Sequence, residues 1–241
     1  MRGYQILSGV LEDYRNDDCG ETWRSLLQHK KLKEKQRAKR DGFSDAFGLR
    51  IHRSISWLGR AEQETDDLDL RFILMWIAFN AAYAQERISE ANGERAEFRS
   101  FFEKLVTSDS SNSIYQFIWM RYSNEIRMLL DNRYVFSPFW QHMNGVEGYE
   151  DWEDRFVSSK RRTATALSQK NTATILEILF DRLYMLRNQL VHGGATWNSS
   201  VNRDQVRDGA AILSSLLPVF VDLMMDNHFL DWGPAHYPVV E

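Results

Sequence analysis

Cysteine and proline are scarce in this sequence. Of the 241 residues, one is a cysteine, Cys19, and four are prolines. A single cysteine excludes an intrachain disulfide and a zinc cluster, and it suits a reducing compartment. No group of histidines, cysteines or carboxylates has the spacing of a metal site. We therefore expect a globular protein without metal or cofactor. The chain is long enough for a hydrophobic core to stabilise the fold.

Long apolar runs are also missing. The first twenty residues bring in acidic side chains too early for the apolar segment of a signal peptide. The longest nearly apolar run, residues 72–84, covers about two-thirds of the roughly 20 residues that a membrane-spanning helix needs. The net charge of −4 at pH 7 gives no global sign of a nucleic-acid-binding protein. We expect a soluble, cytoplasmic protein with no membrane partner.

The alternation of apolar and polar residues that is typical of strands hardly occurs, whereas apolar residues recur at helical spacing along most of the chain. The expected fold class is therefore all-α. The predicted helices cover residues 22–39, 44–64, 70–88, 94–106, 113–131 and 172–191, and a last helix begins at residue 202.

Several of these helices have recognisable ends. Ser44 is placed to cap the start of one helix, and Gly193-Gly194 supplies the left-handed stop of another. Asn202, followed three residues later by Gln205, resembles a capping box at the start of the last helix. Pro218 should bend that helix because it removes a backbone hydrogen bond.

The end of the helix at 172–191 carries the residues best suited to chemistry. Arg187, Asn188 and His192 follow one another just before the two glycines. A polar stripe at steps of three and four residues leads to them, formed by Glu177, Asp181, Tyr184, Asn188 and His192. Such a stripe on an otherwise apolar helix needs partners, for example a second subunit or a phosphate. In the simpler alternative, the Arg and the His only stabilise the helix C-terminus.

A second feature is a basic stretch near the N-terminus. Between Arg24 and Arg40 there are eight lysines or arginines and one acidic residue, Glu34. This stretch could follow an RNA backbone, or it could be a solvated helix face whose charge is offset elsewhere. The candidate substrate contacts are Lys30, Lys31, Lys33 and Arg37, together with Tyr184 one turn before Arg187.

Arg-Asn-x3-His at a helix end, followed by a loop and a final helix, resembles the HEPN superfamily of small all-helical RNases. An earlier helix that carries Trp76, Asn80 and Tyr83 is similar to the accompanying motif of the ApeA-like branch. The resemblance covers about 44–92 and 171–228.

The resemblance implies a homodimeric helical bundle in which the Arg and His of both subunits line one cleft and cleave RNA without a metal. Arg187 and His192 take the catalytic positions, and Asn188 takes the polar position that orients partners. The implied setting is a defence or toxin–antitoxin system with an antitoxin or sensor as partner. Gly194 stands where some toxins of this family carry a modified Tyr, so inactivation by a nucleotidyltransferase antitoxin is not expected here.

The residue types suit that chemistry. Attack of a ribose 2′-hydroxyl on the adjacent phosphate needs a group that titrates near neutrality, and histidine is that group. It also needs a permanent cation for the charge that develops on the phosphate oxygens, which arginine supplies. The product would carry a 2′,3′-cyclic phosphate. The alternative is a non-catalytic HEPN-like dimer that binds RNA, a nucleotide or a protein.

The expected organisation is one HEPN-like domain with additions. Residues 1–43 form an N-terminal segment with the basic helix, and 44–230 form the domain, with core helices at about 44–92 and 171–228. A helical insertion occupies about 93–170, and 231–241 form a C-terminal tail.

Overall fold

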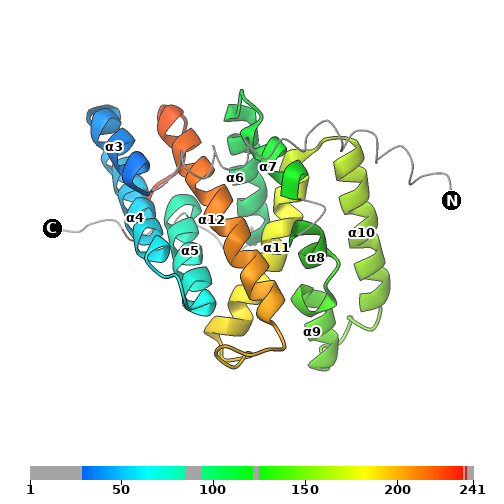
Figure 1. Ribbon diagram of the computed structural model, residues 1–241. Helices are drawn as coiled ribbons and strands as arrows, with labels where there is room; N and C mark the ends of the chain where they lie inside the picture. Colours follow the sequence, from blue (N-terminus) through cyan, green and yellow to red (C-terminus); the bar gives the residue numbers. More distant parts are fainter. Residues whose placement is uncertain (1–28, 85–93, 122–124, 236, 238–241) are drawn as a thin grey trace.

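The computed structural model describes residues 29–84, 94–121, 125–235 and 237, and these ranges contain helices and no strand (Figure 1). The all-α prediction is confirmed. The helices are α3 (His29–Lys39), η1 (Arg40–Gly42), α4 (Asp45–Glu62), α5 (Leu68–Tyr83), α6 (Glu94–Ser108), α7 (Ser113–Arg121), α8 (Arg127–Leu130), η3 (Arg133–Val135), α9 (Ser137–Met143), α10 (Trp152–Ser168), α11 (Thr172–Val191) and α12 (Arg203–Asp226).

Four helices meet around a cluster of phenylalanines. Phe180 of α11 has its ring centroid 4.5 Å from that of Phe79 on α5, 4.8 Å from that of Phe102 on α6 and 5.9 Å from that of Phe220 on α12. Each such pair contributes about 0.5–1.5 kcal/mol beyond the area that it buries. Since α6 supplies one of these rings, the segment expected to be an insertion contributes to the same core as α5, α11 and α12.

The helix α12 crosses its neighbours at close range. An added Cβ at Gly209 would lie 2.9 Å from a ring carbon of Phe72 on α5, and 3.1 and 3.2 Å from methyl carbons of Leu186 and Leu183 on α11. Glycine therefore sets the distance between these three helices. By length and mean hydropathy α12 could cross a membrane, but 67% of its most apolar window is buried inside the bundle, as in the central helix of a soluble protein.

A buried arginine ties the C-terminal segment to the bundle. Arg50 of α4 is 1% exposed. Its guanidinium donates at 2.5–3.3 Å to four backbone carbonyl oxygens, those of Ala82, Ala84, Gly233 and Pro234. Burial lowers the pKa of Arg50 to about 10. The part of the expected tail that the structure describes, 231–235 and 237, is thus packed against α4 and the end of α5; Arg53 of α4 also donates to the Tyr237 carbonyl at 2.8 Å.

The predicted helix ends are confirmed at some positions and wrong at others. Ser44 caps α4 by accepting from the Phe47 amide. Pro218 lies inside α12, which continues through it as one helix, and the bend expected there stays a prediction. The capping box at the start of α12 is wrong, because the Asn202 side chain makes no capping hydrogen bond. Its two side-chain polar atoms and Gln205 Oε1 are buried without a hydrogen-bond partner among the described residues.

Two helices were not predicted. The segment after residue 131 contains α9 and α10, and the residues between them, 144–151, are non-helical. Helix α10 is polar on most of its surface and buries only Thr163 and Ala166, so its apolar periodicity is too weak to detect. The predicted helix at 70–88 begins two residues earlier, at Leu68, and ends at Tyr83, after which Ala84 is extended.

Candidate active site at the end of α11

The predicted motif lies at the C-terminal end of α11. Arg187 and Asn188 are half-buried in its last turns, and His192 is the exposed C-cap residue, whose amide donates to the Asn188 carbonyl at 3.0 Å. Gly193 then adopts a φ of +71°, which glycine accepts without strain. The sequence therefore predicted both the end of this helix and the residue that ends it.

Within the motif, the arginine and its neighbour are bonded and the histidine stands apart. Arg187 Nη1 donates to Asn188 Oδ1 at 2.9 Å, which restricts the guanidinium. The His192 imidazole has no hydrogen bond or ion pair with the residues that the structure describes. One protomer thus presents a partly fixed cation and, beyond the last turn, an imidazole that is open to solvent.

The loop after His192 is held by two acidic residues at the start of α5. Asp69 is buried and accepts from Arg203 Nη2 at 2.8 Å, from Arg203 Nη1 at 2.9 Å and from the Asn198 amide at 3.0 Å. Asp67 caps α5 and accepts from Trp197 Nε1 at 2.8 Å. In Figure 1 the α4–α5 turn and the α11–α12 loop accordingly lie at the same end of the bundle.

The electrostatics of this anchor favour its charged form. The Leu70 amide, above all, lowers the pKa of Asp67 by donating to it; burial acts in the opposite direction, and Trp197 adds a second donor. On its other side, the end of α11 is tied to η3, because Gln189 Nε2 donates to the Tyr134 carbonyl at 2.6 Å. His192 therefore follows a helix end that is held from two directions.

These anchoring residues were not identified from the sequence as parts of the site. Asp67 is the N-cap residue of α5, and Asp69 lies in its first turn. Their bonds to Trp197 and Arg203 join positions 130 and 134 residues apart. No local pattern in one sequence reveals such a pairing.

The remaining motif residues belong mainly to the core. Trp76 and Tyr83 are buried, at 2% and 6% exposure, whereas Asn80 between them is half-buried. Tyr184, a candidate substrate contact, is half-buried, with its ring centroid 6.1 Å from that of Trp76 and 6.5 Å from that of Phe98. These side chains support the helix that carries the motif.

The first two residues of the polar stripe on α11, Glu177 and Asp181, form ion pairs with arginines of the same chain. Glu177 pairs with Arg162 of α10 at 2.7 Å and with Arg99 of α6 at 3.4 Å. Asp181 pairs with Arg182 at 3.0 Å. Asn188 and His192, at the C-terminal end of the stripe, take no part in these ion pairs.

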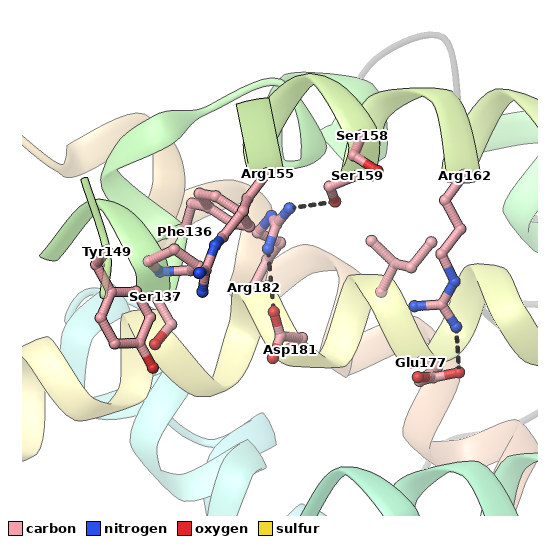
Figure 2. A pocket seen from close by; sticks show the side chains of 12 residues that line it. Phe136, Ser137, Tyr149, Arg155, Ser158, Ser159, Arg162, Glu177, Asp181 and Arg182 are labelled. Carbon is pink, nitrogen blue, oxygen red and sulfur yellow. Dashed lines mark hydrogen bonds and ion pairs between the residues drawn. The ribbon is translucent and has the colours of Figure 1, made fainter. Parts of the chain in front are cut away.

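A pocket of about 380 Å³ lies between α10 and residues 177–182 of α11 (Figure 2). Three arginines line it, and each has a carboxylate partner. Arg162 reaches Glu177, Arg182 is held between Asp181 and Ser159, and Arg155, which points toward Tyr149 in Figure 2, pairs with Asp151 at 2.7 Å. Because the charges nearly balance, the pocket is not a ready anion site.

The candidate substrate lysines and arginine lie on α3. Lys30, Lys31 and Arg37 are exposed and Lys33 is half-buried at the side facing α4. Lys33 Nζ donates to Gln36 Oε1 at 2.9 Å and lies 3.2 Å from His52 Nδ1. Among the described residues, no hydrogen bond or ion pair joins Lys30, Lys33 or Arg37 to the α11 motif, so these three residues lie on a separate surface.

Among the described residues no group of three or more histidines, cysteines or carboxylates could hold a metal ion. Comparisons with protein-family models, with curated proteins and with solved structures gave no match. The assignment of function accordingly rests on the residues at the end of α11.

Proposed function

We propose that this chain is a metal-independent endoribonuclease of the HEPN type, acting in the cytoplasm in a defence or toxin–antitoxin system. The observation that carries the proposal is the Arg187–Asn188–His192 motif at a firmly anchored helix end, with the imidazole exposed. An anchored site is what a reaction that depends on positioning requires.

In the proposed reaction a ribose 2′-oxygen attacks the adjacent phosphorus atom and the bond from phosphorus to the 5′-oxygen breaks. His192 accepts the proton of the 2′-hydroxyl, or in the conjugate role donates one to the departing 5′-oxygen. Arg187 stabilises the negative charge that develops on the phosphate oxygens, with Asn188 holding the guanidinium. The products are a 2′,3′-cyclic phosphate end and a 5′-hydroxyl end.

Since both proton transfers are needed in one cleavage, a single imidazole serves only one of them at a time. A homodimer that brings two copies of the motif into one cleft supplies both. A cognate antitoxin or sensor would control access to this cleft.

The test is cleavage of a mixed single-stranded RNA in EDTA. We expect the wild-type protein to leave cyclic phosphate ends, and His192→Ala to be slower by about 10²–10⁴-fold, the usual contribution of general acid–base catalysis. Arg187→Ala should lose activity as well. His142→Ala is the matched control, because this histidine belongs to α9 and not to the motif, and it should cleave like wild type.

Two outcomes would contradict the proposal. If His192→Ala cleaves as fast as the parent, the site is wrong. If the wild-type protein shifts RNA in a gel but never cleaves it, the chain is the non-catalytic HEPN-like binding module instead.

A further inference from the structure

Five of the six lysines and arginines of α3, together with Arg40 at the start of η1, fall into two groups with different surroundings. Lys35 Nζ lies 2.6 Å from Asp222 Oδ1 and 2.7 Å from Asp226 Oδ2, and Lys39 Nζ lies 2.5 Å from Asp226 Oδ1. Burial pushes the pKa of Asp226 upward, but the two lysines outweigh it and hold the pKa below its ordinary value. These lysines dock α3 onto α12, and their charge is neutralised.

The second group points away from α12. Lys30, Lys33 and Arg37 of α3 and Arg40 at the start of η1 follow one another at steps of three and four residues. They therefore share one side of this helical segment over about 15 Å. We call these four residues the basic face. Among the described residues no carboxylate lies within ion-pair distance of the first three, and Arg40 has only the fully exposed Asp41 at 3.7 Å.

The positive charge of the basic face is left largely uncompensated. The pKa of Lys33 is lowered, first by burial and then by the charges of Arg37 and Arg40. One carboxylate, Glu34, is exposed on the same helix, and it makes no ion pair with a described residue. The face therefore concentrates positive charge in a protein whose net charge is −4.

We propose that the basic face binds the phosphate backbone of the single-stranded RNA that the α11 site cleaves. This inference rests on the proposed function. A row of cations with no neighbouring side chains to recognise bases is suited to binding a phosphate backbone, because phosphates repeat along the RNA strand whatever its sequence. The arginines of the pocket beside α10 could not do this, since each is already engaged by a carboxylate.

The composition of α3 argues against an anionic membrane as the ligand. A helix that lies in a membrane surface exposes large apolar residues beside its cations. The only large apolar residue of α3, Leu32, is 1% exposed and faces the bundle. The basic face is thus purely polar, which fits a solvated polyanion.

The test measures binding of a 20-nucleotide single-stranded RNA to the His192→Ala protein, which does not cut it, over a range of salt concentrations. Adding Lys30→Gln and Arg37→Gln should weaken binding at least tenfold in low salt. It should also reduce the slope of log K against log [salt] by about 1.4, since each lost phosphate contact on a single strand contributes about 0.7.

A matched control removes the same charge elsewhere. Arg127→Gln with Arg161→Gln neutralises two exposed arginines on α8 and α10 and should leave both the affinity and the slope unchanged. If the two double variants behave alike, or if the α3 variant keeps the parental slope, the basic face does not bind RNA. Loss of binding to anionic vesicles or to an acidic protein, with RNA binding intact, would overturn the inference too.

A second measurement separates this inference from the proposed function. A dinucleotide such as UpA has a single phosphodiester, the one that is cleaved, and so offers no further phosphate to the basic face. With His192 present, Lys30→Gln/Arg37→Gln should cleave the dinucleotide at the wild-type rate but the 20-nucleotide RNA more slowly. If wild type cleaves neither RNA, the proposed function fails; if the variant cleaves both like wild type, only the basic face fails.

Discussion

At the scale of single residues, the candidate site depends on side chains that do no chemistry. Asp69 is buried and satisfies both Arg203 and the Asn198 amide. A bidentate pair between arginine and a carboxylate is stronger and more specific in geometry than a single contact. Asp69 therefore determines where the chain after His192 runs.

Asp69→Asn keeps the shape of the side chain but removes its charge. We expect the free energy of unfolding to fall by about 2 kcal/mol, because Arg203 loses its ionic partner but keeps access to water. Urea denaturation measures the change. Asp66→Asn, at an exposed neighbour whose carboxylate only accepts from Thr65, should change stability by less than about 0.5 kcal/mol. Equal effects of the two substitutions would contradict the anchoring role of Asp69.

At the scale of elements, the bundle is held by helices that approach one another closely at small residues. Gly209 lets α12 lie against Phe72 of α5 and against two leucines of α11. The phenylalanine cluster then fills the space where α5, α6, α11 and α12 diverge. The end of α11 is consequently positioned by the packing of whole helices as well as by its anchors.

Two glycine-to-alanine substitutions test this packing. Gly209→Ala should destabilise the fold by about 1–2 kcal/mol, since a Cβ at 2.9 Å from a buried ring overpacks the contact and outweighs the gain in helix propensity. Gly48→Ala in α4 meets only Phe43 Cβ at 3.9 Å and should stabilise by about 0.5–1 kcal/mol. Thermal unfolding measures both. If both substitutions stabilise the protein, a Cβ fits at Gly209 and the close contact of α12 with α5 and α11 does not require glycine.

At the scale of the whole molecule, three of the exposed large apolar residues lie close to the motif along the chain. Val191 is 47% exposed, Trp197 71% and Val201 87%. All three lie at the end of α11 or in the loop that follows it. We therefore propose this surface as the one that a homodimer with a shared cleft buries.

Light scattering at micromolar concentration should accordingly give a mass twice the 28.3 kDa of the chain. Val191→Asp with Val201→Asp should give a folded monomer that no longer cleaves RNA, because a charge in a buried apolar interface is strongly unfavourable. Val157→Asp is the control, at a valine of α10 with 45% exposure, and should remain dimeric. A wild-type protein that is monomeric would contradict the shared cleft.

The sequence alone predicted the features that depend on local chemistry. Helical periodicity gave the all-α class and the extent of α11, and Ser44 and Gly193 marked helix ends because their effect acts within one turn. It failed where local signals were weak or ambiguous. The polar helix α10 has too little apolar periodicity, and Asn202 occupies the N-cap position of α12 without the side-chain hydrogen bond that a capping box requires.

Scarce cysteine, helical periodicity and the order of Arg187, Asn188 and His192 are properties of the chain itself, and they determined the fold class and the candidate residues. Only the tertiary structure decided which charges are free to act. It pairs Lys35 and Lys39 with α12, leaves the basic face open, and ties the loop after His192 to Asp67 and Asp69. These pairings join residues more than a hundred positions apart, and their energy depends on burial and distance, which come into being only when the helices pack.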